Sequence, residues 1–171
     1  NTMSISVKCN VLWDVFNSGN DVNFIGNRAK LSCDSWRTIF GKELITTNKQ
    51  IYHYRLKIHH ACDKGGGFMI GIIPNNKVEA TLTRSFTRYG GFAINKGGLL
   101  FPGGRRYTNV TWRDGDILDV YLDMDLLTLS FAYNGISLGI ACKNLLRQKY
   151  RFAITLLYQD DEVELIDLNK H

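Results

Sequence analysis

One stretch of the chain, residues 114–142, constrains the fold more than any other. Two apolar or alternating runs, 117–122 and 128–133, are followed by Asn134-Gly135 and then by a third run at 136–142. Asn-Gly favours a type I′ turn, because both central residues of that turn need a positive φ that Asn and Gly tolerate. The stretch therefore predicts three consecutive antiparallel strands joined by tight turns.

The rest of the chain continues the pattern of short strands. In residues 51–58, aromatic or aliphatic side chains alternate with His53, Arg55 and Lys57, as in a strand with one buried and one solvated face. Residues 68–73 are continuously apolar, which predicts a central strand. Gly71 inside that run indicates tight packing against another backbone.

Shorter apolar pieces between turn-forming residues extend this β pattern: 5–7, 11–16, 22–25, 29–33, 36–40, 91–94, 99–101, 110–112, 151–157 and 163–167. Residues 74–87 predict a long surface loop, and residues 143–149 a single helical turn. Trp13 and Trp36 are predicted to lie in the core or to cover an edge. Because no segment sustains a 3.6-residue apolar period, we predict an all-β fold, an antiparallel β-sandwich with at most one or two short helical turns.

Length and composition fit one domain over residues 1–171. No apolar run approaches the roughly 20 residues of a membrane-spanning helix, so no membrane segment is expected. The chain begins at Asn1 rather than Met, and we expect it to belong to a larger protein. Four scattered cysteines without a Cys-x-x-Cys pair predict reduced, mostly buried thiols in an intracellular, cytoplasmic protein. Asn109 begins a glycosylation sequon, which matters only if the chain is secreted.

Charge is unevenly distributed along the chain, although the net charge is only +5. Seven basic residues lie between positions 77 and 113, against Glu79 alone: Lys77, Arg84, Arg88, Lys96, Arg105, Arg106 and Arg113. Acidic residues gather later, at 114–125 and 160–167. Arginines interleaved with aromatic residues suit nucleic-acid binding, an acidic peptide partner or simply a solvated loop.

Gly135-Ile136-Ser137-Leu138-Gly139 matches the nucleophile-elbow pattern, which requires a sharp strand-to-helix turn. Here Ser137 lies within a predicted strand, on the face opposite Ile136, Leu138 and Ile140, and no helix follows. Gly139 indicates a bend or a close backbone approach instead. We therefore expect no catalytic serine.

Two other patterns are also better explained without catalysis or metal binding. Glu162 and Glu164 lie on one face of a predicted strand, as paired acids do in sandwich-fold glycosidases, which need two carboxyls at a defined separation. The next residue on that face is Ile166, so the acidic ladder is not completed, and a solvated outer face accounts for both glutamates. His59, His60 and Cys62 supply too few ligands for a closed metal site. Gly65-Gly66-Gly67 lacks the Gly-Lys-Ser/Thr ending of a phosphate loop.

Five ordered elements together resemble the SPRY domain family, over a signature that covers roughly residues 50–167. The central element comprises Asp116-Ile117, Leu122-Asp123, Leu127-Thr128-Leu129-Ser130-Phe131, Asn134-Gly135 and Leu138-Gly139-Ile140-Ala141. The upstream strands Tyr52-His53-Tyr54-Arg55-Leu56 and Phe68-Met69-Ile70-Gly71-Ile72 and the closing strand Phe152-Ala153-Ile154-Thr155-Leu156 match as well. Residues 1–49 resemble the family only by analogy, as N-terminal strands and an extension.

The resemblance implies a bent sandwich of two antiparallel sheets, of concanavalin-like architecture, without catalytic activity, cofactor or metal. It also implies a loop-lined pocket that binds a short peptide or a partner's surface. Carried over by position, the candidate peptide-binding residues are Asn27, Arg28, Gly66, Gly67, Arg88, Tyr89, Tyr158 and Gln159. Tyr158 would be an aromatic anchor, Gly66-Gly67 would admit a close backbone, and Arg28 or Arg88 would pair with acidic groups.

The SPRY resemblance thus predicts a monomeric protein-interaction domain within a larger chain, such as the substrate-recognition part of a ubiquitin ligase or a scaffold. Two alternatives remain open. One is a sandwich-fold carbohydrate-binding protein. The other is nucleic-acid binding through the basic loops 77–113, although a nucleic-acid partner is less favoured than a protein partner.

Overall fold

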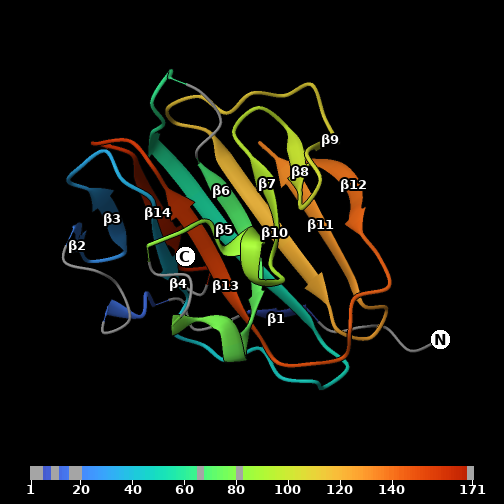
Figure 1. Ribbon diagram of the computed structural model, residues 1–171. Coiled ribbons are helices and arrows are strands. Elements are labelled where there is room, and N and C mark those ends of the chain that lie inside the picture. The colour runs from blue at the N-terminus through green and yellow to red at the C-terminus, as the bar shows by residue number, and fades with distance from the viewer. Residues whose placement is uncertain (1–5, 9–11, 16–20, 65–67, 80–82, 169–171) are drawn as a thin grey trace.

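The chain folds into two β-sheets packed face to face, as the computed structural model shows for residues 6–8, 12–15, 21–64, 68–79 and 83–168 (Figure 1). The first sheet has eight strands in the order β12-β11-β10-β5-β14-β3-β2, with β1 beside β5. Their bounds are β1 Ser6–Lys8, β2 Val22–Ile25, β3 Arg28–Leu31, β5 Ile51–His60, β10 Ile117–Asp123, β11 Thr128–Tyr133, β12 Ile136–Cys142 and β14 Glu162–Ile166.

The second sheet has six strands in the order β4-β13-β6-β7-β8-β9. Their bounds are β4 Arg37–Phe40, β6 Met69–Pro74, β7 Phe92–Asn95, β8 Leu99–Phe101, β9 Arg105–Arg106 and β13 Tyr150–Leu156. Two short 3₁₀ helices, η2 Asn75–Lys77 and η4 Phe86–Tyr89, follow β6. Every pairing in the two sheets is antiparallel except β1 with β5. For the described residues, the predicted all-β sandwich with at most one or two short helical turns is therefore confirmed.

The predicted meander is present as β10, β11 and β12. Asn134 and Gly135 both have positive φ, 47° and 83°, as the type I′ turn requires. Strand β5 pairs with β10 on one side and with β14 on the other, and it alternates buried and partly exposed residues along its length. Its inward side chains meet the second sheet, where the Tyr54 and Phe152 rings stack with centroids 4.6 Å apart. The core therefore lies between the two sheets.

Strand β6 is buried on both faces because the second sheet has a partial third layer. All six of its residues are buried. One face packs on the first sheet, and the other meets Phe86 of η4, which lies on the outer face of the sheet (Figure 1). A Cβ on Gly71 would lie 1.8 Å from the Phe92 carbonyl oxygen, so the close backbone approach predicted there is confirmed.

Several local predictions were wrong. Residues 143–149 form no helical turn, and residues 110–112 form no strand; instead, Trp112 is 1% exposed, and its backbone N–H donates to the Lys96 carbonyl. The predicted loop 74–87 contains η2 and the start of η4. Of the apolar piece 11–16, the described residues 12–15 form only an isolated bridge at Trp13.

The alternate isoleucines of β12 do not enter the core. Ile136 and Ile140 are 69% and 61% exposed. Ile136 pairs with Tyr133 at the end of β11, whereas Ile140 lies beyond a register shift between β11 and β12 and pairs with Ser130. Gly139 has φ +86°, and a Cβ added there would meet no atom within 4 Å, so it marks a bend rather than a close approach. Edge strand β12 thus presents an apolar surface to solvent.

Candidate functional site

Loops from distant parts of the chain meet at one end of the second sheet. The register places Leu156 of β13 opposite Arg37 of β4, and Thr155 opposite Met69 of β6. Because these strands are antiparallel, the residues after β13, before β4 and before β6 all emerge at the same end. Residues 34–36, 61–64 and 157–161 therefore form a common rim.

The turn after β13 is held by two carboxylates. Asp161 is 1% exposed, and its Oδ2 accepts the backbone N–H of Tyr158 at 3.0 Å while Oδ1 accepts that of Cys62 at 2.9 Å. The N–H of Gln159 donates to Asp34 Oδ1 at 2.8 Å. Neither aspartate was predicted as a site residue. Their hydrogen bonds fix the backbone of the rim, so its side chains are presented in a defined arrangement.

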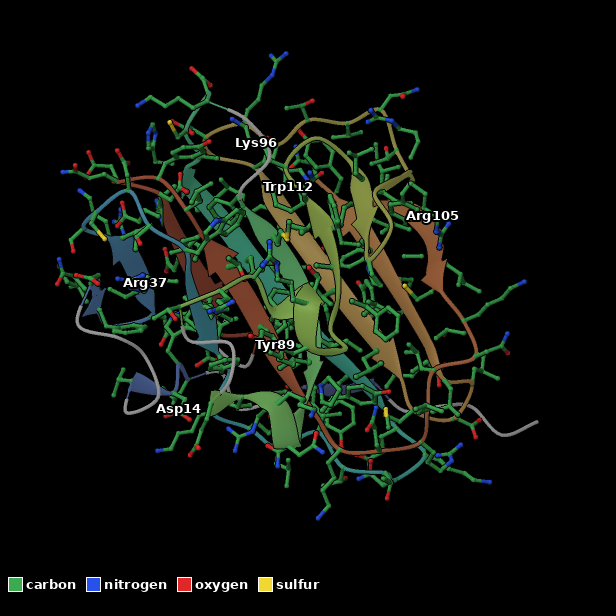
Figure 2. The ribbon with its side chains drawn as sticks, in the orientation of Figure 1. Asp14, Arg37, Tyr89, Lys96, Arg105 and Trp112 are labelled. Carbon is green, nitrogen blue, oxygen red and sulfur yellow. The ribbon has the colours of Figure 1, made fainter. Side chains whose placement is uncertain are left out.

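A hollow of about 340 Å³ lies beside this rim, lined by Trp36, Thr83, Arg84, Ser85 and Arg88. The Trp36 side of the hollow is fixed by Arg37 (Figure 2), which donates to the Trp36 carbonyl at 2.7 Å and to Ser35 Oγ at 3.0 Å. Trp36 is half-buried against Phe40 and its neighbours on the outer face of the second sheet.

The other wall of the hollow is positioned by two buried threonines. Thr38 Oγ1 donates to the Arg84 carbonyl at 2.6 Å, and the two Oγ1 atoms of Thr38 and Thr155 lie 2.7 Å apart. Since the Thr38 proton goes to Arg84, Thr155 is the donor in that pair. Phe86, at the end of this wall, is fully buried and so holds the wall against the sheet. The backbone at 84–86 is therefore held to the sheet.

Arg84 and Arg88 extend from this fixed backbone. Both are exposed, and neither side chain makes a hydrogen bond or ion pair within the described part of the chain. An arginine that makes no internal contact keeps its five donors for a carboxylate or phosphate. The hollow thus combines a half-buried tryptophan with two guanidinium groups that make no hydrogen bond or ion pair within the described residues.

Three of the predicted binding residues lie at this end. Arg88 lines the hollow itself. Tyr158 and Gln159 stand on the rim, where the half-buried Tyr158 donates its hydroxyl to the Lys64 carbonyl at 3.3 Å. Gly66 and Gly67 lie outside the described residues, between Lys64 and the start of β6.

The other predicted binding residues lie elsewhere. Tyr89 ends η4 near the opposite end of the sheet, where the next residue, Gly90, approaches Pro74 (Figure 2). Asn27 lies in the β2–β3 turn, and its carbonyl accepts the Trp13 indole N–H at 2.8 Å. Arg28 pairs with Glu162 at 3.0 Å. Their roles in binding stay predictions, and the structure does not place them at the hollow.

Sequence reasoning missed Trp36 as a candidate site residue and named Arg84 only as one of the basic run that could bind an acidic peptide or nucleic acid. It assigned Trp36 to the core or an edge, and the half-buried ring does pack on the outer cluster of the second sheet. The signal that would have distinguished Trp36 is a long-range contact. The Thr38 hydroxyl of β4 donates to the Arg84 carbonyl, which brings positions 36 and 84 together and is not encoded in local pattern.

Comparisons with solved structures place this architecture among known folds. No protein-family model and no curated protein matches the chain. The SPRY domain of human HERC1 is similar with a TM-score of 0.67 and 16% identity, covering 85% of this chain and 91% of that one. A second human SPRY domain is similar at 0.67 and 15%, covering 90% and 99%. The neuralized NHR1 domain of Drosophila melanogaster is similar at 0.66 and 15%, covering 91% and 96%.

The chain has the SPRY fold. The resemblance of residues 50–167 to SPRY domains is therefore confirmed at the level of structure, and the coverage of the solved domains extends it into the first 50 residues. At 15–16% identity, the similarity to the SPRY and NHR1 domains is one of fold.

Within this SPRY fold, the basic run of residues 77–113 does not form one continuous patch. Lys96 is 8% exposed, and its ammonium group donates to the carbonyls of Ala61 and Cys62 at 3.2 and 2.6 Å. Arg105 and Arg106 also donate to backbone carbonyls. These three cations therefore stabilise loops of the SPRY fold, which weakens the nucleic-acid alternative.

The motifs that suggested catalysis or metal binding have structural explanations. Ser137 is exposed within β12, and its Oγ accepts the N–H of Gly139 at 3.3 Å. His59 contacts Glu164 at 2.7 Å, whereas His60 contacts Asp114 at 3.0 Å. In the described part of the chain, no three potential ligands among His, Cys, Asp and Glu gather closely enough to hold a metal ion.

Cys33, Cys62 and Cys142 are free thiols and half-buried rather than fully buried. Among the described residues, no helix has the length and apolar character needed to cross a bilayer.

Proposed function

We propose that this chain is a non-catalytic protein-interaction domain that binds a short acidic segment of a partner protein in the hollow beside Trp36. The observation that carries the proposal is the pair of arginines, Arg84 and Arg88, held without internal side-chain partners around a half-buried tryptophan in the described part of the chain. The SPRY fold supports an interaction role. We further propose that the domain recognises substrates or partners for a larger chain, such as a ubiquitin ligase or a scaffold.

The chemistry of the hollow favours an acidic ligand. A guanidinium fork matches a carboxylate with two parallel hydrogen bonds, and Trp and Arg dominate the energetics of many interfaces. The wall at 84–86 is already tied to Thr38 and Thr155. Binding to a preordered wall loses less conformational entropy than binding to a loop that must fold around its ligand.

A peptide selection followed by charge reversal tests this proposal. Twelve-residue random peptides displayed on phage are selected on the wild-type domain, and enriched sequences are synthesised and measured by fluorescence anisotropy. We expect acidic peptides whose affinity falls at least tenfold with Arg88→Glu, because attraction to a carboxylate becomes repulsion. Lys149→Glu is the matched control, since Lys149 is exposed next to the start of β13, at the far end from the hollow.

Tyr158 supplies the second arm of the same test. Tyr158→Ala should weaken binding by about 1–3 kcal/mol, a typical hot-spot loss, while the melting temperature stays nearly unchanged because the ring is only half-buried. If all enriched peptides lack acidic residues, or all keep full affinity for the Arg88→Glu domain, the hollow is refuted as the binding site.

A further inference from the structure

A second and larger hollow, of about 450 Å³, lies between the open edges of the two sheets. One wall comes from the second sheet and is apolar: Phe92, Leu100, Phe101 and Pro102. The opposite wall is the end of edge strand β12, where Ile140, Ala141 and Cys142 line the space. This side of the sandwich contains none of the residues of the Trp36 hollow, so the two surfaces are separate.

Two side chains, Arg105 of β9 and Tyr107 just after it, hydrogen-bond across this hollow to the edge strand β12. The Tyr107 hydroxyl donates to the Gly139 carbonyl, and Arg105 Nη2 donates to the Ala141 carbonyl. Figure 2 shows Arg105 beside β12. These bonds occupy carbonyls of an edge strand that would otherwise accept a further strand. A peptide ligand would therefore insert its own side chains into this hollow, and its backbone would not pair as a further strand with residues 139–141.

The charge around the hollow has one sign. Arg105 and Lys143 line it, and no carboxylate of the described residues does. The two chain segments that meet here, residues 80–113 and 126–159, contain no Asp or Glu at all, although the whole protein has sixteen. A ligand complementary to this surface therefore carries a negative charge, together with an apolar group that fills the space between Phe101 and Ile140.

We propose that this groove between β8 and β12 is a second docking site, which binds a partner-protein segment carrying an aromatic or aliphatic side chain next to acidic residues. The apolar side chain enters between the rings of the second sheet and exposed Ile140, and a flanking carboxylate pairs with Lys143. Apolar burial and the ion pair with the exposed Lys143 both contribute to binding. The site goes beyond the proposed function and does not depend on it.

Disabling the Trp36 hollow first makes the test specific. Twelve-residue random peptides are selected on the Arg88→Glu domain, and the enriched peptides are measured by fluorescence anisotropy. We expect sequences that combine acidic with aromatic or aliphatic residues. Lys143→Glu and Ile140→Ser should each weaken their binding at least tenfold, and bound peptide should slow alkylation of Cys142, which lines the groove.

Two substitutions serve as matched controls. Lys149→Glu repeats the charge reversal at an exposed lysine outside the groove, and Ile136→Ser repeats the polar substitution at an exposed isoleucine of the same strand. Both should change affinity less than twofold. Because Lys143, Ile140 and both control residues are exposed, all four variants are expected to fold, which circular dichroism and the melting temperature verify.

Four results would each overturn the groove proposal: no enriched peptide, enriched peptides without acidic residues, equal losses in the groove and control variants, or unchanged alkylation of Cys142. Two further outcomes would assign the surface to another occupant and overturn it as well. These are saturable binding to phosphatidylserine vesicles that Lys143→Glu abolishes, and a concentration-dependent dimer that Ile140→Ser dissociates. Failure of the groove proposal would not refute the proposal for the Trp36 hollow, because that proposal is tested with peptides selected on the wild-type domain and measured on the Arg88→Glu domain.

Discussion

At the scale of single residues, a buried aspartate on a strand is explained by its neighbours. Asp119 interrupts an otherwise apolar stretch of β10 and is 2% exposed. His53 Nε2 lies 2.5 Å and Arg55 Nε 2.8 Å from its Oδ1, both from β5. Burial alone would raise the pKa of Asp119, but the hydrogen bonds from His53 and Arg55 outweigh it and lower the pKa.

Replacing this carboxylate should destabilise the first sheet. Asp119→Asn removes the charge that Arg55 and His53 contact, and we expect the free energy of unfolding to fall by about 1–3 kcal/mol, measured by urea denaturation. Asp125→Asn, at an exposed turn position, should change it by less than about 0.5 kcal/mol. Equal losses in the two variants would show that the Asp119 cluster contributes nothing specific.

His60 and Asp114 form a pH-dependent pair at the surface of the first sheet. The hydrogen bond to Asp114 raises the pKa of His60 above its ordinary value of 6.5. A raised histidine pKa stabilises the fold fully below the unfolded pKa, and this contribution disappears as pH rises through the folded value. Burial tends to raise the pKa of Asp114, but hydrogen bonds from His60 and Ala61 lower it below 3.8, so its contribution disappears as pH falls through that lower value.

The His60–Asp114 pair should therefore stabilise the protein from about pH 4 to about pH 6.5 and progressively less above. Both side chains are about half exposed, so the effect is small. The difference in unfolding free energy between wild type and His60→Ala should be larger at pH 5.5 than at pH 8.5. A difference that is constant or grows with pH would contradict the assignment.

At the scale of elements, the sequence predicted strands where local pattern and burial agree. Strand β5 alternates, β6 is continuously apolar, and the turn at Asn134-Gly135 has its own conformational requirement, so all three were predicted correctly. The prediction of a strand at 110–112 was wrong because Trp112 is buried by tertiary contacts, with its ring edge-on to Phe68, and not by a sheet. Aromatic content alone does not distinguish these two forms of burial.

Two glycines in neighbouring layers should respond differently to the same substitution. Gly71→Ala places a Cβ 1.8 Å from the Phe92 carbonyl oxygen, so β6 and β7 must separate, and we expect a loss of more than about 3 kcal/mol or failure to fold. Gly139→Ala meets no atom within 4 Å but retains φ +86°, which costs about 1 kcal/mol. Urea denaturation compares them, and a Gly71→Ala loss no larger than that of Gly139→Ala would contradict the close packing.

At the scale of the whole molecule, the candidate site depends on long-range pairing that local sequence does not encode. Trp36 and Arg84 are 48 positions apart in the chain and meet only because β4 pairs with β13 beneath the wall that Thr38 holds. Linear charge was misleading for the same reason: Lys96 and Arg105 belong to the basic run, yet their charged groups bind backbone carbonyls. The number of basic residues in a segment therefore overstates the positive charge available to a partner, because some of these residues bind backbone carbonyls within the fold.

We expect the sandwich to require the first 50 residues, although strands were hardest to predict from the sequence in this part of the chain. They supply β2 and β3 at one edge of the first sheet, and β4 beside β13 in the second. Leu31, Ile39 and Phe40 are each fully buried there. At about 1.5–3 kcal/mol each, their burial is comparable with the whole stability of a typical domain, about 5–15 kcal/mol.

We therefore expect a fragment of residues 50–168, which retains the recognisable SPRY signature, to show no cooperative thermal transition. Without β4, strand β13 presents an open edge, and the wall at 84–86 loses the Thr38 hydroxyl that holds it. Adding a fragment of residues 1–49 in trans should restore the transition and, with Trp36 back in place, peptide binding at the hollow. A cooperative transition in the shorter fragment alone would instead make residues 50–168 the folding unit and the preceding strands an accessory layer.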